Sequence, residues 1–242
     1  LAHVKKRFQN SKLDLGGGNL VDINLEDIDL TGAAYNDERV AHANGVNYDV
    51  TINTKNFEFT GSRNRTINHT GDTITKRDLA TLLPQHIVKE YDGQPAFDQN
   101  NRDYVNAMAK ENLTTVVERD KNKIQLAVTG TYDNRNASAN TKAEAEARTP
   151  GTAERNVTYT LTLSGDADTL TNYTIGGHPT TNTVTGKADI YKKKLTVDVG
   201  RKEKDYDGTA AVNNLTRGDI VYNGLVNGEN LSLDPGALNK VQ

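Results

Sequence analysis

Residues 74–93 have the sequence ITKRDLATLLPQHIVKEYDG, and residues 190–208 repeat it as IYKKKLTVDVGRKEKDYDG. In both stretches a lysine-rich, strand-like segment leads into a Tyr-Asp-Gly triplet, and Tyr91 and Tyr206 lie 115 positions apart. That spacing is the length of one small domain, so the sequence predicts a tandem array of like modules cut from a longer chain. Such arrays more often span distance or repeat a surface than form a single catalytic pocket.

Weaker matches extend the repeat over the whole sequence. The matching pairs are residues 112–114 with 214–216 and loosely 19–21, residues 132–134 with 35–37, and residues 172–175 with 56–59. From them we expect a degenerate or N-truncated unit over residues 1–73, a complete unit over 74–189 and a C-truncated unit over 190–242. Residues 138–154 have no counterpart in the first unit and are expected to form an inserted loop.

Alternation of apolar and polar residues dominates the sequence, as in residues 46–52 (VNYDVTI) and 157–163 (VTYTLTL). This period of two is typical of strands buried on one face. Further strands are expected at residues 23–25, 124–128, 195–199, 220–222 and 231–233. The pattern predicts an all-β chain of tandem, elongated β-sandwich modules with an immunoglobulin-like architecture. The alternative is a β-grasp-like module with one short helix over residues 103–111, capped by Asp103. Residues 141–148 have helix-forming composition but no apolar face, so we expect an exposed loop there.

Composition excludes several classes of function. The net charge of −3 provides no basic surface for nucleic acid, and aromatic residues make up only 6% of the chain, without tryptophan. No apolar run approaches the roughly 20 residues that span a bilayer, so we expect no membrane insertion. There is no cysteine, and therefore no disulfide and no thiolate metal site. The histidines do not form a His-Glu-x-x-His motif, and no serine lies in a Gly-x-Ser-x-Gly elbow. We expect no enzyme activity, no metal and no cofactor.

Four features together resemble the YDG-type repeat of large secreted bacterial adhesins of the filamentous-haemagglutinin kind. They are residues 89–93 (KEYDG), 204–209 (KDYDGT), 163–167 (LSGDA) and 172–174 (NYT). The resemblance covers residues 74–242, with a degraded match over 1–73, and the inserted 138–154 loop departs from the pattern. It implies a surface-exposed β spacer in a long exoprotein, secreted or at the bacterial cell surface, with neighbouring repeat modules as partners and no activity of its own.

The Tyr-Asp-Gly triplet also has a physical interpretation that needs no family. An aspartate side chain can bond back to the backbone, and glycine tolerates the positive φ of a tight turn. We expect the tyrosine to anchor the turn in the core. Calcium binding by the neighbouring acidic residues is the alternative, but Ca²⁺ requires six to eight oxygens, more than they supply. The residues assigned to this structural turn are Tyr91, Asp92 and Gly93 in one copy and Tyr206, Asp207 and Gly208 in the other.

A spacer that projects a distal binding region is therefore the leading functional hypothesis. The alternative is that the modules themselves bind a host glycan or protein through surface loops, because binding residues concentrate in loops on rigid scaffolds. The inserted loop is the candidate, with Ser138, Lys142, Glu144, Glu146 and Arg148 as its candidate binding residues. We also expect the third unit to present unpaired strand edges or a bare apolar face. It is then either poorly ordered or completed by another chain, for example head-to-tail by the first unit.

Overall fold

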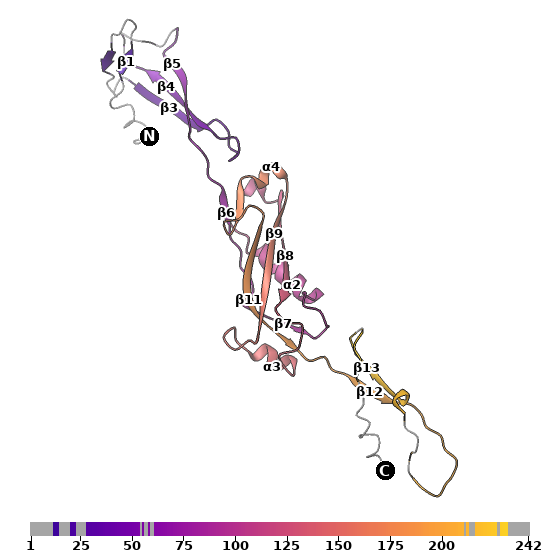
Figure 1. The fold of residues 1–242 in the computed structure, drawn as a ribbon. Coiled ribbons are helices and arrows are strands. Elements are labelled where there is room, and N and C mark those ends of the chain that lie inside the picture. Colours follow the sequence, from indigo (N-terminus) through magenta and orange to yellow (C-terminus); the bar gives the residue numbers. More distant parts are fainter. Residues whose placement is uncertain are drawn as a thin grey trace. The chain divides into compact units, whose positions relative to one another are not determined.

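The computed structural model describes residues 12–14, 20–22, 28–53, 55, 58, 61–210, 212, 216–226 and 228–231. Strands dominate, helices are few and short, and the strands form several separate sheets (Figure 1). The expectation of a predominantly β chain is confirmed. The strand expected at residues 23–25, most of the one at 231–233 and parts of the repeat matches at 19–21, 56–59 and 214–216 lie outside the described residues.

The chain forms two compact units, and each is assembled from separate stretches of sequence. Unit 1 contains residues 1–79, 117–124 and 165–179, and unit 2 contains residues 80–116, 125–164 and 180–242. The three repeat units expected from the sequence have other boundaries, which remain predictions.

Unit 1 contains an antiparallel sheet in the order β3-β4-β5, a β1–β2 hairpin and a parallel β6–β10 pair. Its strands are β1 (Lys12–Asp14), β2 (Leu20–Asp22), β3 (Ile28–Tyr35), β4 (Gly45–Ile52), β5 (Asn64–Thr70), β6 (Arg77–Leu79) and β10 (Tyr173–Ile175), and its short helices are η2 (Glu118–Asp120) and α4 (Ala167–Leu170). Val50 and Ile52 on β4 are buried, as the alternation predicts. The hydroxyl of Tyr173 donates to buried Asp120 at 2.8 Å, which ties β10 to η2.

Unit 2 is built on a four-stranded mixed sheet in the order β7-β11-β9-β8, in which β11 runs antiparallel to β9 and parallel to β7. Only the first residue of β8 and the last of β9 belong to unit 1. The elements are β7 (His86–Glu90), α2 (Gln99–Glu111), β8 (Ile124–Tyr132), α3 (Lys142–Ala147), β9 (Arg155–Gly165) and β11 (Thr181–Tyr191), followed by β12 (Thr196–Val199), η3 (Arg217–Asp219) and β13 (Ile220–Asn223).

Helix α2 packs against this sheet. It begins one turn earlier than the sequence suggested, because the cap is Asp98, whose side chain accepts a hydrogen bond from the Asn101 N–H, and not Asp103. Its Val105 and Ala109 are fully buried. Asn106 exchanges two hydrogen bonds of 2.8 Å with the backbone of Val128 on β8, so the helix is fastened to the sheet as well as packed on it.

The expectation of an exposed loop at residues 141–148 is wrong. Residues 142–147 form helix α3, and the side chain of Thr141 caps it by accepting from the Glu144 N–H at 3.1 Å. A six-residue helix is unstable alone because its nucleation cost is not recovered. Here tertiary packing stabilises it, since Ala145 is completely buried.

An aromatic cluster fills the core beside α2. The ring of Phe97 makes edge-to-face contacts with Tyr132 and Tyr159, at centroid distances of 6.2 and 5.9 Å. Gly130 leaves the space for this ring, because a Cβ at that position would lie only 2.0 Å from its atoms. The glycine is therefore required for packing.

We expect Gly130→Ala to destabilise unit 2 by about 2 kcal/mol, since the new methyl group displaces the Phe97 ring. Gly151→Ala is the matched control, because the nearest atom to its Cβ would be Thr149 Oγ1 at 3.8 Å, an ordinary contact. Thermal unfolding of both variants checks the prediction, and equal midpoints would contradict it.

The β12–β13 hairpin exposes an apolar surface. The two strands pair in antiparallel fashion from Thr196 with Asn223 to Val199 with Ile220. Val197, Val199 and Val221 are each at least half exposed. By this register Val197 and Val199 lie on one face beside Tyr222 and Ile220, and Val221 lies on the other face opposite Asp198. The exposed apolar side chains of this strand pair are therefore divided between its two faces.

Candidate functional site

The first Tyr-Asp-Gly turn is organised around a lysine. Lys89 Nζ donates to Asp92 Oδ1 at 2.7 Å, to the Gln94 carbonyl at 2.6 Å and to the Ala96 carbonyl at 2.9 Å. Asp92 Oδ1 also accepts from the Gln94 N–H at 2.9 Å, and Gly93 adopts a φ of 76°. The aspartate thus bonds back to the backbone and the glycine takes a positive φ, as the sequence predicts.

The second turn is built from the same bonds. Lys204 Nζ donates to Asp207 Oδ1 and to the Thr209 carbonyl, both at 2.9 Å, and the Thr209 N–H donates to Asp207 Oδ1 at 2.9 Å. The φ of Gly208 is 77°. The bond from Lys204, together with those from Thr209, lowers the pKa of Asp207. The lysine three positions before the aspartate was missed by sequence reasoning, although its spacing is the same in both copies.

The two turns differ in their surroundings. The Lys89 side chain is 0% exposed, and its ammonium group lies 5.1 Å from the centroid of the Tyr132 ring. The Lys204 side chain is 38% exposed. The same bonding pattern is therefore buried in the first turn and exposed in the second. The two turns can serve as variant and control in one experiment.

The expectation that the tyrosine anchors the turn in the core is wrong for the second copy and is only partly met in the first. Tyr206 is 97% exposed. Tyr91 is half-buried, and its hydroxyl donates to Glu229, a bond that raises the pKa of Tyr91. The buried lysine holds the first turn in the core instead.

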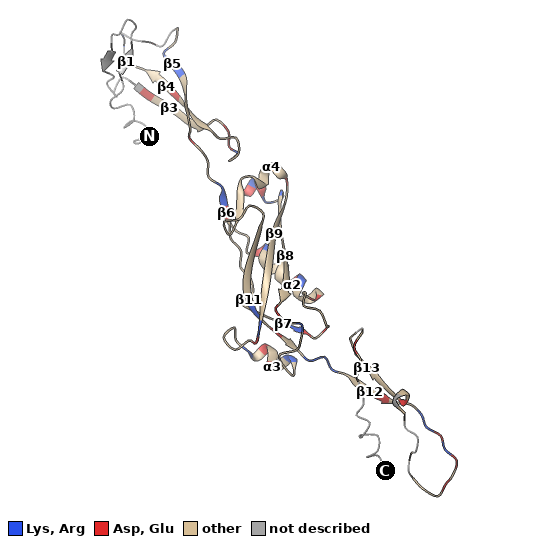
Figure 2. Cartoon of the chain, viewed as in Figure 1, with Lys and Arg blue, Asp and Glu red and all other residues tan. Residues whose placement is uncertain are grey.

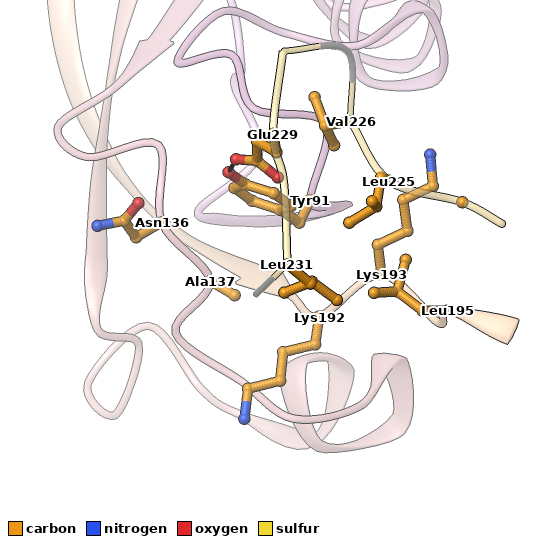
Figure 3. Close-up of a pocket in the computed structure, with 11 residues that line it drawn as sticks. Tyr91, Asn136, Ala137, Lys192, Lys193, Leu195, Leu225, Val226, Glu229 and Leu231 are labelled. Atoms are coloured by element: carbon orange, nitrogen blue, oxygen red, sulfur yellow. Dashed lines mark hydrogen bonds between the residues drawn. The ribbon is translucent and has the colours of Figure 1, made fainter. Parts of the chain in front are cut away.

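Tyr91 also lines a cavity of about 310 Å³ in unit 2 (Figure 3). In the close-up the carboxylate of Glu229 lies against the Tyr91 hydroxyl, and leucine side chains form much of the remaining wall. The lining residues are Tyr91, Asn136, Ala137, Lys192, Lys193, Leu195, Gly224, Leu225, Val226, Glu229 and Leu231. This lining is mainly apolar and contains a single carboxylate, so it offers no paired acids for hydrolysis.

The inserted loop is fastened to Asp189, a fully buried aspartate on β11. Asp189 Oδ1 accepts from Ser138 Oγ and from Arg148 Nη1, both at 2.7 Å, and Oδ2 contacts His86 Nε2 at 3.0 Å. The Glu154 N–H donates to Oδ1 at 3.3 Å. Both ends of the 138–154 loop therefore meet at one carboxylate. In the sequence, the feature that could have indicated this site is an aspartate placed between two apolar residues, Ala188 and Ile190.

The candidate binding residues of the loop divide into two groups. Ser138 and Arg148 are held by Asp189, and Glu144 accepts from the Asn140 N–H at 2.8 Å and pairs with Arg148 at 3.0 Å. These three hold the loop in place. Lys142 and Glu146 form an exposed ion pair of 3.5 Å on α3 and are accessible to a partner.

The Asp189 cluster is not arranged for nucleophilic catalysis. A Ser-His-Asp triad needs a serine hydrogen-bonded to histidine, and the histidine in turn to aspartate. Here Ser138 and His86 each contact Asp189 directly, and no hydrogen bond joins Ser138 to His86. The geometry instead neutralises a buried charge.

We expect the stability of unit 2 to fall in acid through Asp189. Burial raises the pKa of this carboxyl. The hydrogen bonds from Ser138, the Glu154 backbone and His86 and the positive charge of Arg148 lower it by more, so the pKa of Asp189 is below its ordinary value. The stabilisation is therefore complete above the unfolded value of about 3.9 and is lost as the pH falls through the folded pKa. Unfolding measured between neutral pH and pH 2 checks this, and Asp189→Asn should flatten the acid limb. An unchanged limb in that variant would contradict the assignment.

Other classes of site are not indicated in the described part of the chain. No group of three or more His, Asp or Glu side chains among these residues could hold a metal ion. No described helix has the length and apolar character needed to cross a membrane. Figure 2 shows Lys and Arg interspersed with Asp and Glu along the described elements.

Comparisons with known proteins found no matching family model, no matching curated protein and no matching solved structure.

Proposed function

We propose that the chain is a set of non-catalytic spacer modules from a bacterial surface adhesin, secreted or held at the cell surface, which project a distal binding region. The observation that carries this proposal is the turn that recurs after 115 residues with the same lysine–aspartate and aspartate–backbone bonds and the same positive φ at its glycine. A structural unit repeated with its internal bonds intact is typical of arrays that gain length by adding copies.

The chemistry of the chain supports the same proposal. Interspersed charges of both signs keep an extended array soluble and suppress association between strand edges. The modules are stabilised by a buried lysine turn and a buried aspartate cluster in a chain that has no cysteine.

The detailed module architecture belongs to the proposal as well. Tandem immunoglobulin-like β-sandwiches and β-grasp-like modules with one short helix are the two candidates. Helix α2 packed on a single four-stranded mixed sheet favours the β-grasp-like alternative for the complete repeat.

Small-angle X-ray scattering tests the spacer function. A compact globule of this length has a radius of gyration of about 18 Å. A spacer must be longer than a globule, so we expect a radius well above that value and a maximum dimension that grows when a further repeat is fused. A radius near the compact value would overturn the proposal.

A second candidate function is binding of a host glycan or protein through α3. The observation that favours it is the exposed Lys142–Glu146 pair on a helix that the Asp189 cluster holds firmly. Deleting residues 138–154 is a poor test, because it would leave Asp189 buried without its partners. The double variant Lys142→Ala, Glu146→Ala keeps the fold, and binding to host cells or a glycan array should then be lost. Equal binding by this variant and the wild type excludes α3.

A further inference from the structure

The chain enters and leaves the sheet of the complete repeat through two neighbouring strands. It reaches β7 through residues 80–85, and it leaves β11 after Tyr191 toward β12. β7 and β11 pair in parallel, from His86 with Lys187 to Glu90 with Tyr191. The covalent path along the chain therefore enters at the start of β7 and leaves at the end of β11, which are opposite ends of one strand pair.

Tension along the chain loads this pair in shear. It pulls β7 by its first residue and β11 by its last, so the two strands are drawn past each other along their length. The hydrogen bonds of a parallel pair are evenly spaced between the strands, and sliding strains all of them at once. Two strands that are pulled apart from ends lying side by side separate one bond at a time instead.

Backbone hydrogen bonds extend the pair beyond both ends of β7. The Lys187 N–H donates to the Gln85 carbonyl at 3.2 Å, one residue before β7 begins. The Tyr91 N–H donates to the Tyr191 carbonyl at 2.9 Å, one residue after β7 ends. Sliding of one strand past the other has to break these bonds together with those of the pair itself.

A buried charged group also fastens each strand to the rest of the repeat. On β7, the Lys89 side chain is 0% exposed and makes the three bonds of the first Tyr-Asp-Gly turn. On β11, Asp189 is bonded to Ser138 and Arg148, each at 2.7 Å, and contacts His86 on β7 at 3.0 Å. A strand that slides separates a buried charge from its partners, which is costly. Both clusters therefore oppose motion along the strands.

The β12–β13 hairpin has the opposite geometry. β12 begins at Thr196 and β13 ends at Asn223, and these two residues are paired. Tension along the chain thus pulls on two ends that lie side by side, and the residue pairs of the hairpin open in turn. The resistance to shear is a property of the β7–β11 pair that the hairpin does not share.

We propose that the β7–β11 pair is a mechanical clamp, which keeps the complete repeat folded when the chain is pulled along its length. The inference rests on the proposed spacer function, because a spacer between a surface and a bound partner transmits the tension between them. Forced unfolding depends on the unfolding rate and not on the equilibrium stability. The clamp therefore provides a resistance to force that the stability of the repeat does not by itself supply.

Unfolding of the 242-residue chain in optical tweezers, pulled in two directions, tests the proposal. The chain contains no cysteine, so a pair of introduced cysteines defines where the handles attach. Gln85→Cys with Lys192→Cys loads the strand pair in shear, and Glu90→Cys with Lys192→Cys pulls on two ends that lie side by side. All three replaced residues are exposed, so both variants should have the wild-type stability in urea. We expect the force that unfolds the complete repeat to be at least about twofold higher in shear, because all the bonds then resist together.

His86→Ala, introduced into both cysteine variants, tests the contact between the two strands. It removes the bond to Asp189, which lies at the end of the pair remote from Glu90. The force in shear should fall, and the force in the side-by-side direction should not change, because separation there begins with other bonds.

Equal forces in the two directions, or a His86→Ala variant that lowers both forces alike, would overturn the clamp. Either result leaves the length of the chain in solution unaffected. A compact radius of gyration in X-ray scattering would instead overturn the spacer function, and it does not alter the ratio of the two forces.

Discussion

Replacing Lys89 with methionine is expected to destabilise unit 2 by about 3 kcal/mol, because it leaves a carboxylate and two carbonyls without their donor. Methionine retains most of the volume of the buried stem, so the loss reports the three bonds of the ammonium group rather than a cavity. Asp92 is 37% exposed and can regain some hydration, which keeps the effect below that of a fully enclosed charge. Hydrogen exchange of the β9 amides measures this loss of stability within unit 2.

The second turn provides the control for this experiment. Lys204→Met removes the same bonds from a lysine that is 38% exposed, next to an aspartate that is 43% exposed. Water replaces the lost partners there, so the expected change is below about 1 kcal/mol. Equal effects at Lys89 and Lys204 would show that burial does not determine the strength of the turn.

Asp189→Ala is expected to cost 3 to 5 kcal/mol, roughly the cost of removing one partner from a buried ion pair. The variant removes the buried carboxylate that pairs with Arg148, whose side chain is only 16% exposed and keeps its contacts with Glu144 and Glu154. Residues 138–154 should then become susceptible to proteases, because both of their ends are bonded to Asp189. Urea unfolding together with limited proteolysis measures the two effects.

Two further variants define the cause of that loss. Asp133→Ala removes an exposed carboxylate that accepts from the backbone and side-chain N–H groups of Asn156, each at 2.9 Å, and should cost under about 1 kcal/mol. Adding Arg148→Met to Asp189→Ala removes the guanidinium that has lost its buried partner and should recover part of the stability. If the double variant is less stable than the single one, the ion pair is not the source of the effect.

Local sequence patterns were sufficient to place many of the elements. The alternation in residues 157–163 lies within β9, and the strand expected at residues 220–222 lies within β13. The aspartate and glycine of the turn behave as their local chemistry predicts, since a φ near 77° and a bond to the following backbone depend only on neighbouring residues.

The tertiary structure determines which partners these residues have and how far they are buried. Asp98 rather than Asp103 caps α2, and α3 exists because Ala145 is buried and Arg148 is bonded to a strand 41 positions away. Lys89 and Lys204 have the same local sequence context, yet one is buried under Tyr132 and the other faces solvent. A pattern of neighbours specifies which bonds a turn can make. Burial depends on residues distant in sequence, and it determines how much those bonds contribute to the stability of the fold.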